Sequence, residues 1–323
     1  MALRLGRKSR FFVHRMALTV PVLFGVSLVV FAMLHLTPGD PASAMLGPRA
    51  TPEALERLRA ALGLDRPLPV QYVTWLGNIL QGDFGQSIQR GEPVLPEVID
   101  RLGNSLILAV AAFVFAALGG IAIGVAAALR RGTALDRGVM LLSSLGISTP
   151  PFWLGIVLIV VFSIWLGLFP SGGMAPITAT DPGPLTLAWH VVLPAVTLGA
   201  APLAVIARMT RSSMLEELGQ EYVVAARAKG ISARRIVVNH ALRNAFSSIL
   251  TVLGLQIGFL LAAGVLAEIV FSWPGLGSLM LDAILTRDFP LTQGAVLVVA
   301  AVYVVANAVV DTLYAVNDPR VRL

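Results

Sequence analysis

The sequence predicts an all-α membrane protein with six transmembrane helices. Hydrophobic residues make up 56% of the 323 residues and charged residues only 13%, whereas soluble proteins carry about 25% charged residues. Six stretches without Asp, Glu, Lys or Arg are long enough to cross the hydrocarbon core, which needs about 20 residues. The 24 Lys and Arg residues are concentrated in alternate segments between these stretches. Together these observations exclude a water-soluble enzyme, a disordered chain and a disulfide-stapled secreted protein.

The expected spans follow from the positions of the uncharged stretches. The third stretch differs from the others, because Pro150-Pro151 divides its 43 residues into segments of about 12 and 29 residues, and 12 residues are too few to cross. We expect one span there, which the prolines can kink, followed by an exit turn at 170–173. The six spans are expected at residues 16–38, 104–129, 139–168, 186–207, 244–267 and 289–316.

The N-terminal segment also has features of a secretory signal peptide. Its start is basic, an apolar run follows, and Ala42-Ser43-Ala44 is similar to a signal-peptidase site. An apolar signal region is only about 7–15 residues long, whereas this one exceeds 20 residues. We therefore expect the segment to be retained as a membrane anchor.

The orientation follows from the basic residues, which stay on the cytoplasmic side of a membrane. With the N-terminus (1–15) inside, 17 of the 24 Lys and Arg residues lie in expected cytoplasmic segments, seven of them in segment 208–243. The expected outer segment 39–103 holds six, which are outnumbered by eight acidic residues. We therefore expect both ends of the chain in the cytoplasm.

The outer segment 39–103 is expected to form a small cap rather than an independent domain. Thr51-Pro52-Glu53 predicts the start of a short helix that ends at Gly63. A second amphipathic stretch covers about 70–80 and a turn follows at 82–85. A structural lid and a docking surface remain equally open.

The cytoplasmic segment 208–243 contains a short helical pattern. Small residues precede Gly230, which predicts a helix that stops at a C-terminal glycine. Ser232 is the expected N-cap of a second helix. From the residues alone, a plain charged loop and a corner that another protein approaches closely are both open.

Several catalytic and coupling motifs are missing from the sequence. It has no Cys, no phosphate-binding G-x-x-x-x-G-K-[ST] loop, no H-E-x-x-H pair and no G-x-S-x-G elbow. None of the expected spans has a charged residue at its centre, although a secondary transporter working alone needs an intramembrane coupling site. The basic residues follow the membrane, so we expect a lipid bilayer and no nucleic acid as partner. The energy for any transport is therefore expected to come from another protein, and a membrane-embedded enzyme is disfavoured.

Short motifs run in order along nearly the whole chain: TPGDP at 37–41, LGLD at 62–65, GDFG at 82–85, PFWLG at 151–155, TRSSMLE at 210–216, FSWPGLG at 271–277 and DPR at 318–320. Their order and spacing resemble the permease subunits of bacterial ATP-binding-cassette (ABC) importers, in particular the B-type subunit of the dipeptide, oligopeptide and nickel systems.

The resemblance implies a type I ABC importer permease fold in the bacterial inner membrane, with a permease domain at 104–316. It implies a second, homologous permease chain, two cytoplasmic ATPases and an extracytoplasmic solute-binding protein as partners. ATP and Mg²⁺ would be bound by the ATPases, with no cofactor on this chain and no catalytic residue. Short peptides are the implied cargo, and nickel, glutathione or another small solute is the alternative.

The resemblance also implies site residues. The family's cytoplasmic E-A-A-x-x-x-G loop, which docks on the ATPase, is matched by Ala225, Ala226 and Gly230, while the Glu position holds Val224 and the nearest acid is Glu221. The family's later I-x-L-P ending is absent. The expected coupling residues are Glu221, Ala225, Ala226, Gly230, Ile231 and Ser232. The expected contacts to the binding protein are Asp40, Asp83, Trp273 and Asp282.

Overall fold

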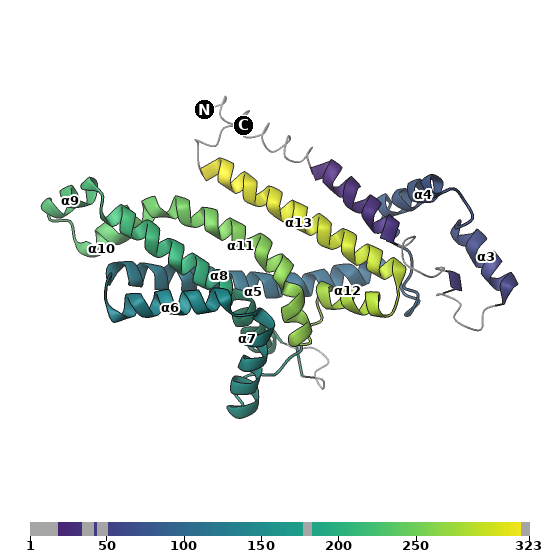
Figure 1. Cartoon of the computed structure of the whole chain (residues 1–323), viewed down its shortest axis with the longest axis horizontal. Coiled ribbons are helices and arrows are strands. Elements are labelled where there is room, and N and C mark those ends of the chain that lie inside the picture. Colours follow the sequence, from purple (N-terminus) through teal and green to yellow (C-terminus); the bar gives the residue numbers. More distant parts are fainter. Residues whose placement is uncertain (1–18, 34–41, 44–50, 177–182, 318–323) are drawn as a thin grey trace, which may run out of the picture. The chain divides into compact units, whose positions relative to one another are not determined.

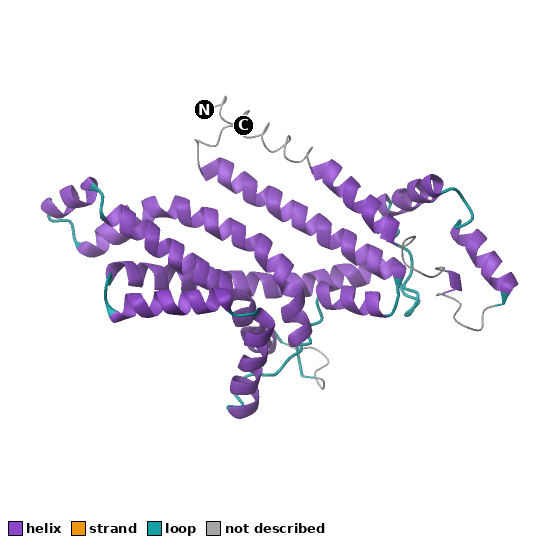
Figure 2. Ribbon diagram, in the orientation of Figure 1, coloured by secondary structure: helices purple, strands orange, loops and turns teal. Residues whose placement is uncertain are grey.

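The computed structural model describes residues 19–33, 42–43, 51–176 and 183–317. These residues form helices and loops, with a single isolated bridge between Gln86 and Pro93 and no strand among them (Figure 2). They divide into two compact units. The first unit comprises 105–274 and the end of the last helix, and the second comprises the described residues up to 104 together with 275–305.

The first unit is a bundle of long apolar helices. Figure 1 shows α5 (Val94–Leu129), of which the part from Ser105 belongs here, with α8 (Pro184–Leu218) and α11 (Arg243–Val270). Glycines bring α5 close to α8: a Cβ at Gly124 would lie 2.5 Å from the carbonyl oxygen of Ala207. Small residues let membrane helices approach closely, because packing rather than the hydrophobic effect joins them in lipid.

The stretch expected as one kinked span, 139–168, is two helices in the structure. Helix α6 (Ala134–Ser148) and the pair α7 (Pro151–Leu158) and η1 (Ile159–Trp165) are bent by 108° at the intervening prolines. Pro150 has no amide hydrogen, and Pro151 is suited to the first helical position, so the backbone is interrupted and restarted there.

The turn after this pair packs on the end of α11. Gly173 N donates to Phe271 O at 2.8 Å, and a Cβ at Gly172 would lie 2.4 Å from the same oxygen. His190 of α8 is buried, and its Nδ1 lies 3.1 Å from Gly173 O. His190 is therefore a packing residue.

The expected cytoplasmic segment 208–243 is mostly a continuation of helices. Helix α8 runs on to Leu218, and α10 (Ala233–Arg235) and η2 (Ile236–Leu242) lead into α11 without a break. Only α9 (Glu221–Ala228) and its two corners lie between them.

Among the residues that the structure describes, four helices are long and apolar enough to cross a membrane, and the bent pair would make a fifth. They are Val94–Leu129, Pro184–Leu218, Ala233–Val270 and Phe289–Val310. Helix Thr19–Met33 is apolar but shorter, and both flanks of the first expected span, 16–38, lie outside the described residues.

The second unit contains the cap segment, helix Thr19–Met33, α12 (Leu276–Leu285) and the first part of α13 (Phe289–Asn317). The expected helix after Thr51 is confirmed as α3 (Pro52–Leu62): the Thr51 hydroxyl accepts from Ala54 N at 3.3 Å, and Gly63 ends the helix with φ 65°. Helix α4 (Leu68–Leu80) packs on Thr19–Met33, where the Tyr72 and Ser27 hydroxyls lie 2.8 Å apart. The cap segment is thus tied to an apolar helix.

Candidate functional site

Helix α9 ends in a hydrogen-bonded turn that requires a glycine. Ile231 N donates to Ala226 O at 3.2 Å, and Gly230 N donates to Arg227 O at 2.9 Å. This pair of bonds is a Schellman motif, which needs a residue in the left-handed region at its turn. Gly230 supplies that conformation with φ 74°, as expected from the sequence.

The two faces of α9 have different roles. Val223 and Ala226 are buried and pack with Ile231 and Ile236. Ala226, expected among the coupling residues, is only 7% exposed and packs α9 against the residues that follow it.

The opposite face of α9 is open. Its exposed residues follow the i, i+3, i+4, i+7 spacing of one helical face: Glu221, Val224, Ala225 and Ala228. We call these four residues the α9 surface. Val224 and Ala228 were not among the expected site residues, although helical spacing from Glu221 could have found them.

Ser232 occupies the expected N-cap position but does not act through its side chain. Its backbone is extended, with φ −61° and ψ 144°, and α10 starts at the next residue. The hydroxyl makes no capping hydrogen bond. The backbone turn, rather than the side chain, therefore sets the corner between α9 and α10.

An ion pair ties the turn between α5 and α6 to α8. The Arg211 guanidinium pairs with both carboxylate oxygens of Asp136, with Arg211 Nη2 2.8 Å from Oδ2, and Gly132 N donates to Oδ2 at 2.9 Å. The bond from Arg211 is the largest cause, and that from Gly132 the next, of a pKa of Asp136 that is lowered from 3.8 to about 2. Thr133 caps α6 by accepting from Asp136 N at 3.4 Å. The sequence analysis did not find this pair.

In the second unit, the expected outer segments 39–103 and 268–288 contact each other. Arg90 Nη2 donates to Asp282 at 2.9 Å, and the same guanidinium pairs with Glu97. Asp288 is buried and accepts from the Ser87 hydroxyl at 2.5 Å. It also accepts from the backbone amides of residues 89 and 291, at 3.2 and 3.3 Å. Asp288, missed from the sequence, thus joins the turn 85–93 to the start of α13.

Two of the four expected binding-protein contacts remain on the surface of the second unit. Asp83 is exposed and accepts from Gly85 N at 2.9 Å within its turn. The side chain of Asp282 is 56% exposed despite its pairing with Arg90. Asp40 lies outside the described residues.

The fourth expected contact, Trp273, is buried in the structure. Its relative exposure is 0%, and it packs in the first unit with apolar residues such as Leu108 and Leu260. Trp273 N donates to Glu268 O at 2.8 Å and so ends α11. A fully buried indole cannot contact a partner unless the core opens.

The sequence matches two models of known protein families. Residues 8–109 match the family described as the N-terminal part of a binding-protein-dependent transport system membrane component. Residues 120–323 match the family described as binding-protein-dependent transport system inner membrane component. The chain belongs to this family. It is therefore a multi-pass permease of the inner membrane.

Relatives of this permease component are similar along nearly their whole length. This chain is 45% identical to the di/tripeptide transport system permease protein DppB of Pseudomonas aeruginosa, over 97% of this chain and 98% of that protein. It is 42% identical to the dipeptide transport system permease protein DppB of Escherichia coli K12 over the same shares. A chain of the inward-facing MetNI methionine ABC transporter matches with TM-score 0.56 and 19% identity, over 68% of this chain and 96% of that one. This likeness shows a shared ABC-transporter fold.

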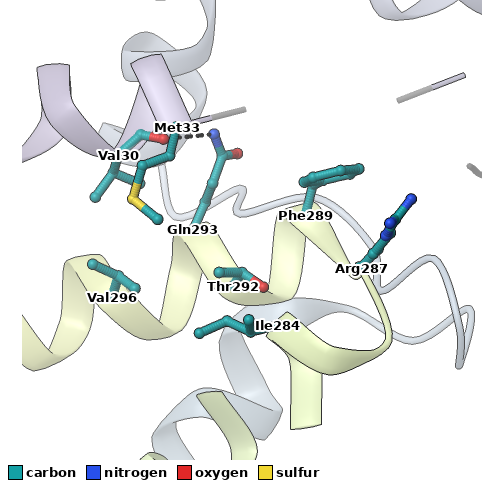
Figure 3. Close-up of a pocket in the computed structure, with 8 residues that line it drawn as sticks. All are labelled: Val30, Met33, Ile284, Arg287, Phe289, Thr292, Gln293 and Val296. Atoms are coloured by element: carbon teal, nitrogen blue, oxygen red, sulfur yellow. Dashed lines mark hydrogen bonds between the residues drawn. The ribbon is translucent and has the colours of Figure 1, made fainter. Parts of the chain in front are cut away.

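The second unit of the permease component also contains a small apolar cavity (Figure 3). Its volume is about 180 Å³, and it lies between helix Thr19–Met33 and the corner that joins α12 to α13. Gln293 Nε2 donates to Val30 O at 3.3 Å at its edge. This bond satisfies a buried amide and connects the N-terminal apolar helix to α13.

Proposed function

We propose that this chain is the permease subunit of an ATP-driven importer of short peptides, delivered by an extracytoplasmic solute-binding protein. The observation that carries the proposal is the identity of 45% and 42%, over 97% of the chain, to permeases named for di- and tripeptides. Nickel, glutathione and other small solutes are the competing cargoes, and a secondary transporter is the less favoured class.

The chain itself is non-catalytic in this proposal. ATP and Mg²⁺ would be held by two separate ATPase subunits, and a second, homologous permease would complete the pathway. The sequence lacks a phosphate-binding loop.

The proposed topology has six spans with both ends of the chain in the cytoplasm, in line with the distribution of Lys and Arg. Because the chain has no Cys, single cysteines can report location without background. Glu92→Cys should react with an impermeant thiol reagent in intact cells, whereas Ser232→Cys should react only after permeabilisation. Both residues are exposed, so labelling of position 232 from outside would reverse the orientation.

The α9 surface is the proposed contact with the ATPase. Alanines at its centre let a partner backbone approach closely, and the buried residues behind it fix α9 to the helix ends. An apolar cluster then joins α5, α8, η2 and α11 through residues such as Met214, Ala241 and Ala245. Close-packed elements move as rigid bodies, so displacement of α9 would be transmitted to the spanning helices.

The test is a reconstituted complex of both permeases, the ATPases and the binding protein. Peptide-loaded binding protein should stimulate ATP hydrolysis above the unloaded form. The double variant His35→Ala, His190→Ala removes the two histidines that lie in expected spans. It should transport peptide, because metal coordination is not required. Stimulation by nickel but by no peptide, lost in this variant, would replace peptides by nickel as the cargo.

A further inference from the structure

A larger cavity lies in the first unit behind the α9 surface. Its volume is about 560 Å³, within the range of about 300–1,000 Å³ common for ligand pockets. Its walls come from the ends of α5 and α8 and from the segment between α9 and η2. We call this cavity the helix-end pocket.

The helix-end pocket combines aliphatic walls with two positive charges. The aliphatic part includes Leu129, Leu215, Leu218 and Ile236, and the charges are those of Arg131 and Arg227. Both arginines are exposed, and neither is within ion-pair distance of a carboxylate in the described part of the chain. The pocket therefore suits a ligand with an apolar body and an anionic group.

The helix-end pocket lies at the ends of helices that are long and apolar enough to cross a membrane, and its walls include Leu129, Leu218 and Ala233. Leu129 is the last residue of the uncharged stretch 102–129, and Arg130 and Arg131 follow it directly. Aliphatic walls at the end of an apolar helix meet the acyl chains, and the first arginines beyond it reach the headgroup level. Basic pockets between transmembrane helices at this level bind anionic lipid headgroups.

The position of Arg227 separates the helix-end pocket from the α9 surface. Arg227 is exposed and lines the pocket, whereas the four residues of the α9 surface are not among its lining residues. A ligand in the pocket and an ATPase on the α9 surface can thus be bound together.

We propose that the helix-end pocket binds one anionic phospholipid, with its phosphate at Arg131 and Arg227 and an acyl chain along the aliphatic walls. In the orientation proposed above, this lipid belongs to the cytoplasmic leaflet. The lipid fills the space between α9 and the helix ends and supports the coupling corner from behind. The inference rests on the membrane location of the chain and not on its cargo.

The experiment uses the purified permease–ATPase complex in nanodiscs that contain dioleoyl-phosphatidylglycerol and dioleoyl-phosphatidylcholine. Retained lipid is counted by native mass spectrometry. Each basic residue near an anionic headgroup contributes about a fivefold preference, so Arg131→Gln, Arg227→Gln should lower the preference for phosphatidylglycerol about 25-fold. The matched control is Arg234→Gln, Arg235→Gln, which removes two exposed charges of the same segment that do not line the pocket.

Replacement of both pocket arginines by lysine should keep the lipid, because the charge remains, and so separates lost binding from misfolding. Four results would overturn the proposal. They are unchanged retention in the glutamine variant, equal loss in the control, displacement of the lipid by inorganic phosphate alone, and release of the lipid when the ATPase binds. The last result would assign the pocket to the ATPase. If the unsubstituted complex retains the lipid but transports no peptide, only the proposed function is contradicted.

Discussion

Substitution of Gly230 by alanine should weaken binding of the ATPase without any new steric contact. An added Cβ at Gly230 would meet no heavy atom within 4 Å, but the backbone has φ 74°. A left-handed conformation costs an L-residue about 1–2 kcal/mol. If α9 must keep its Schellman turn to present the α9 surface, this cost lowers the population of the binding form about five- to thirty-fold.

The assay is the affinity of the purified ATPase for the permease pair in nanodiscs, together with ATP hydrolysis at saturating ATPase. The apparent dissociation constant should rise by the same factor, while hydrolysis at saturation recovers. Gly230→Asn should lose less than Gly230→Ala, because asparagine tolerates the left-handed region better.

Gly63→Ala is the matched control. Gly63 ends α3 with φ 65° and the same pair of backbone bonds, Leu64 N to Arg59 O and Gly63 N to Ala60 O. Its added Cβ would make only ordinary contacts, the nearest at 3.6 Å. The local cost is therefore the same, but ATPase affinity should not change. Normal affinity of Gly230→Ala, or equal loss in both variants, would refute the reasoning.

Three further predictions concern the packing around the site. Gly124→Ala should destabilise the complex by about 1–3 kcal/mol, because its Cβ would lie 2.5 Å from a carbonyl oxygen of α8. Gly264→Ala is the control and should not destabilise it, because an added Cβ there would meet nothing within 4 Å. Thermal unfolding in detergent measures both variants. Asp136→Asn should lower stability by the same amount at pH 8 and pH 5. The pKa of the carboxyl is about 2 in the folded protein. The ion pair therefore contributes its full stability above the unfolded pKa of 3.8 and loses it only as pH falls toward 2. A stability difference between the two proteins that shrinks from pH 8 to pH 5 would contradict this. Asp288→Asn should expose the turn 85–93 to proteolysis more than Arg90→Gln does, because a buried acceptor with three donors costs more to replace than an exposed ion pair.

The sequence by itself determined the features that depend on neighbouring residues. The apolar stretches predicted helices that the structure contains at Val94–Leu129, Pro184–Leu218 and Phe289–Val310. Thr51, Gly63 and Gly230 marked helix ends correctly, because a cap is a bond between a residue and the turn beside it. The order of short motifs also predicted the family.

Only the tertiary structure decided which of these residues are exposed and which are buried. Ala226 and Trp273 look equivalent to exposed residues in the sequence, yet both are buried by segments that are distant along the chain or lie across a turn. The 108° bend between α6 and α7 required more than two prolines, since their effect depends on what the separated helices can pack against. Arg211 meets Asp136 across 75 positions of sequence. Contacts of this kind arise from the joint packing of several helices, which no local pattern contains.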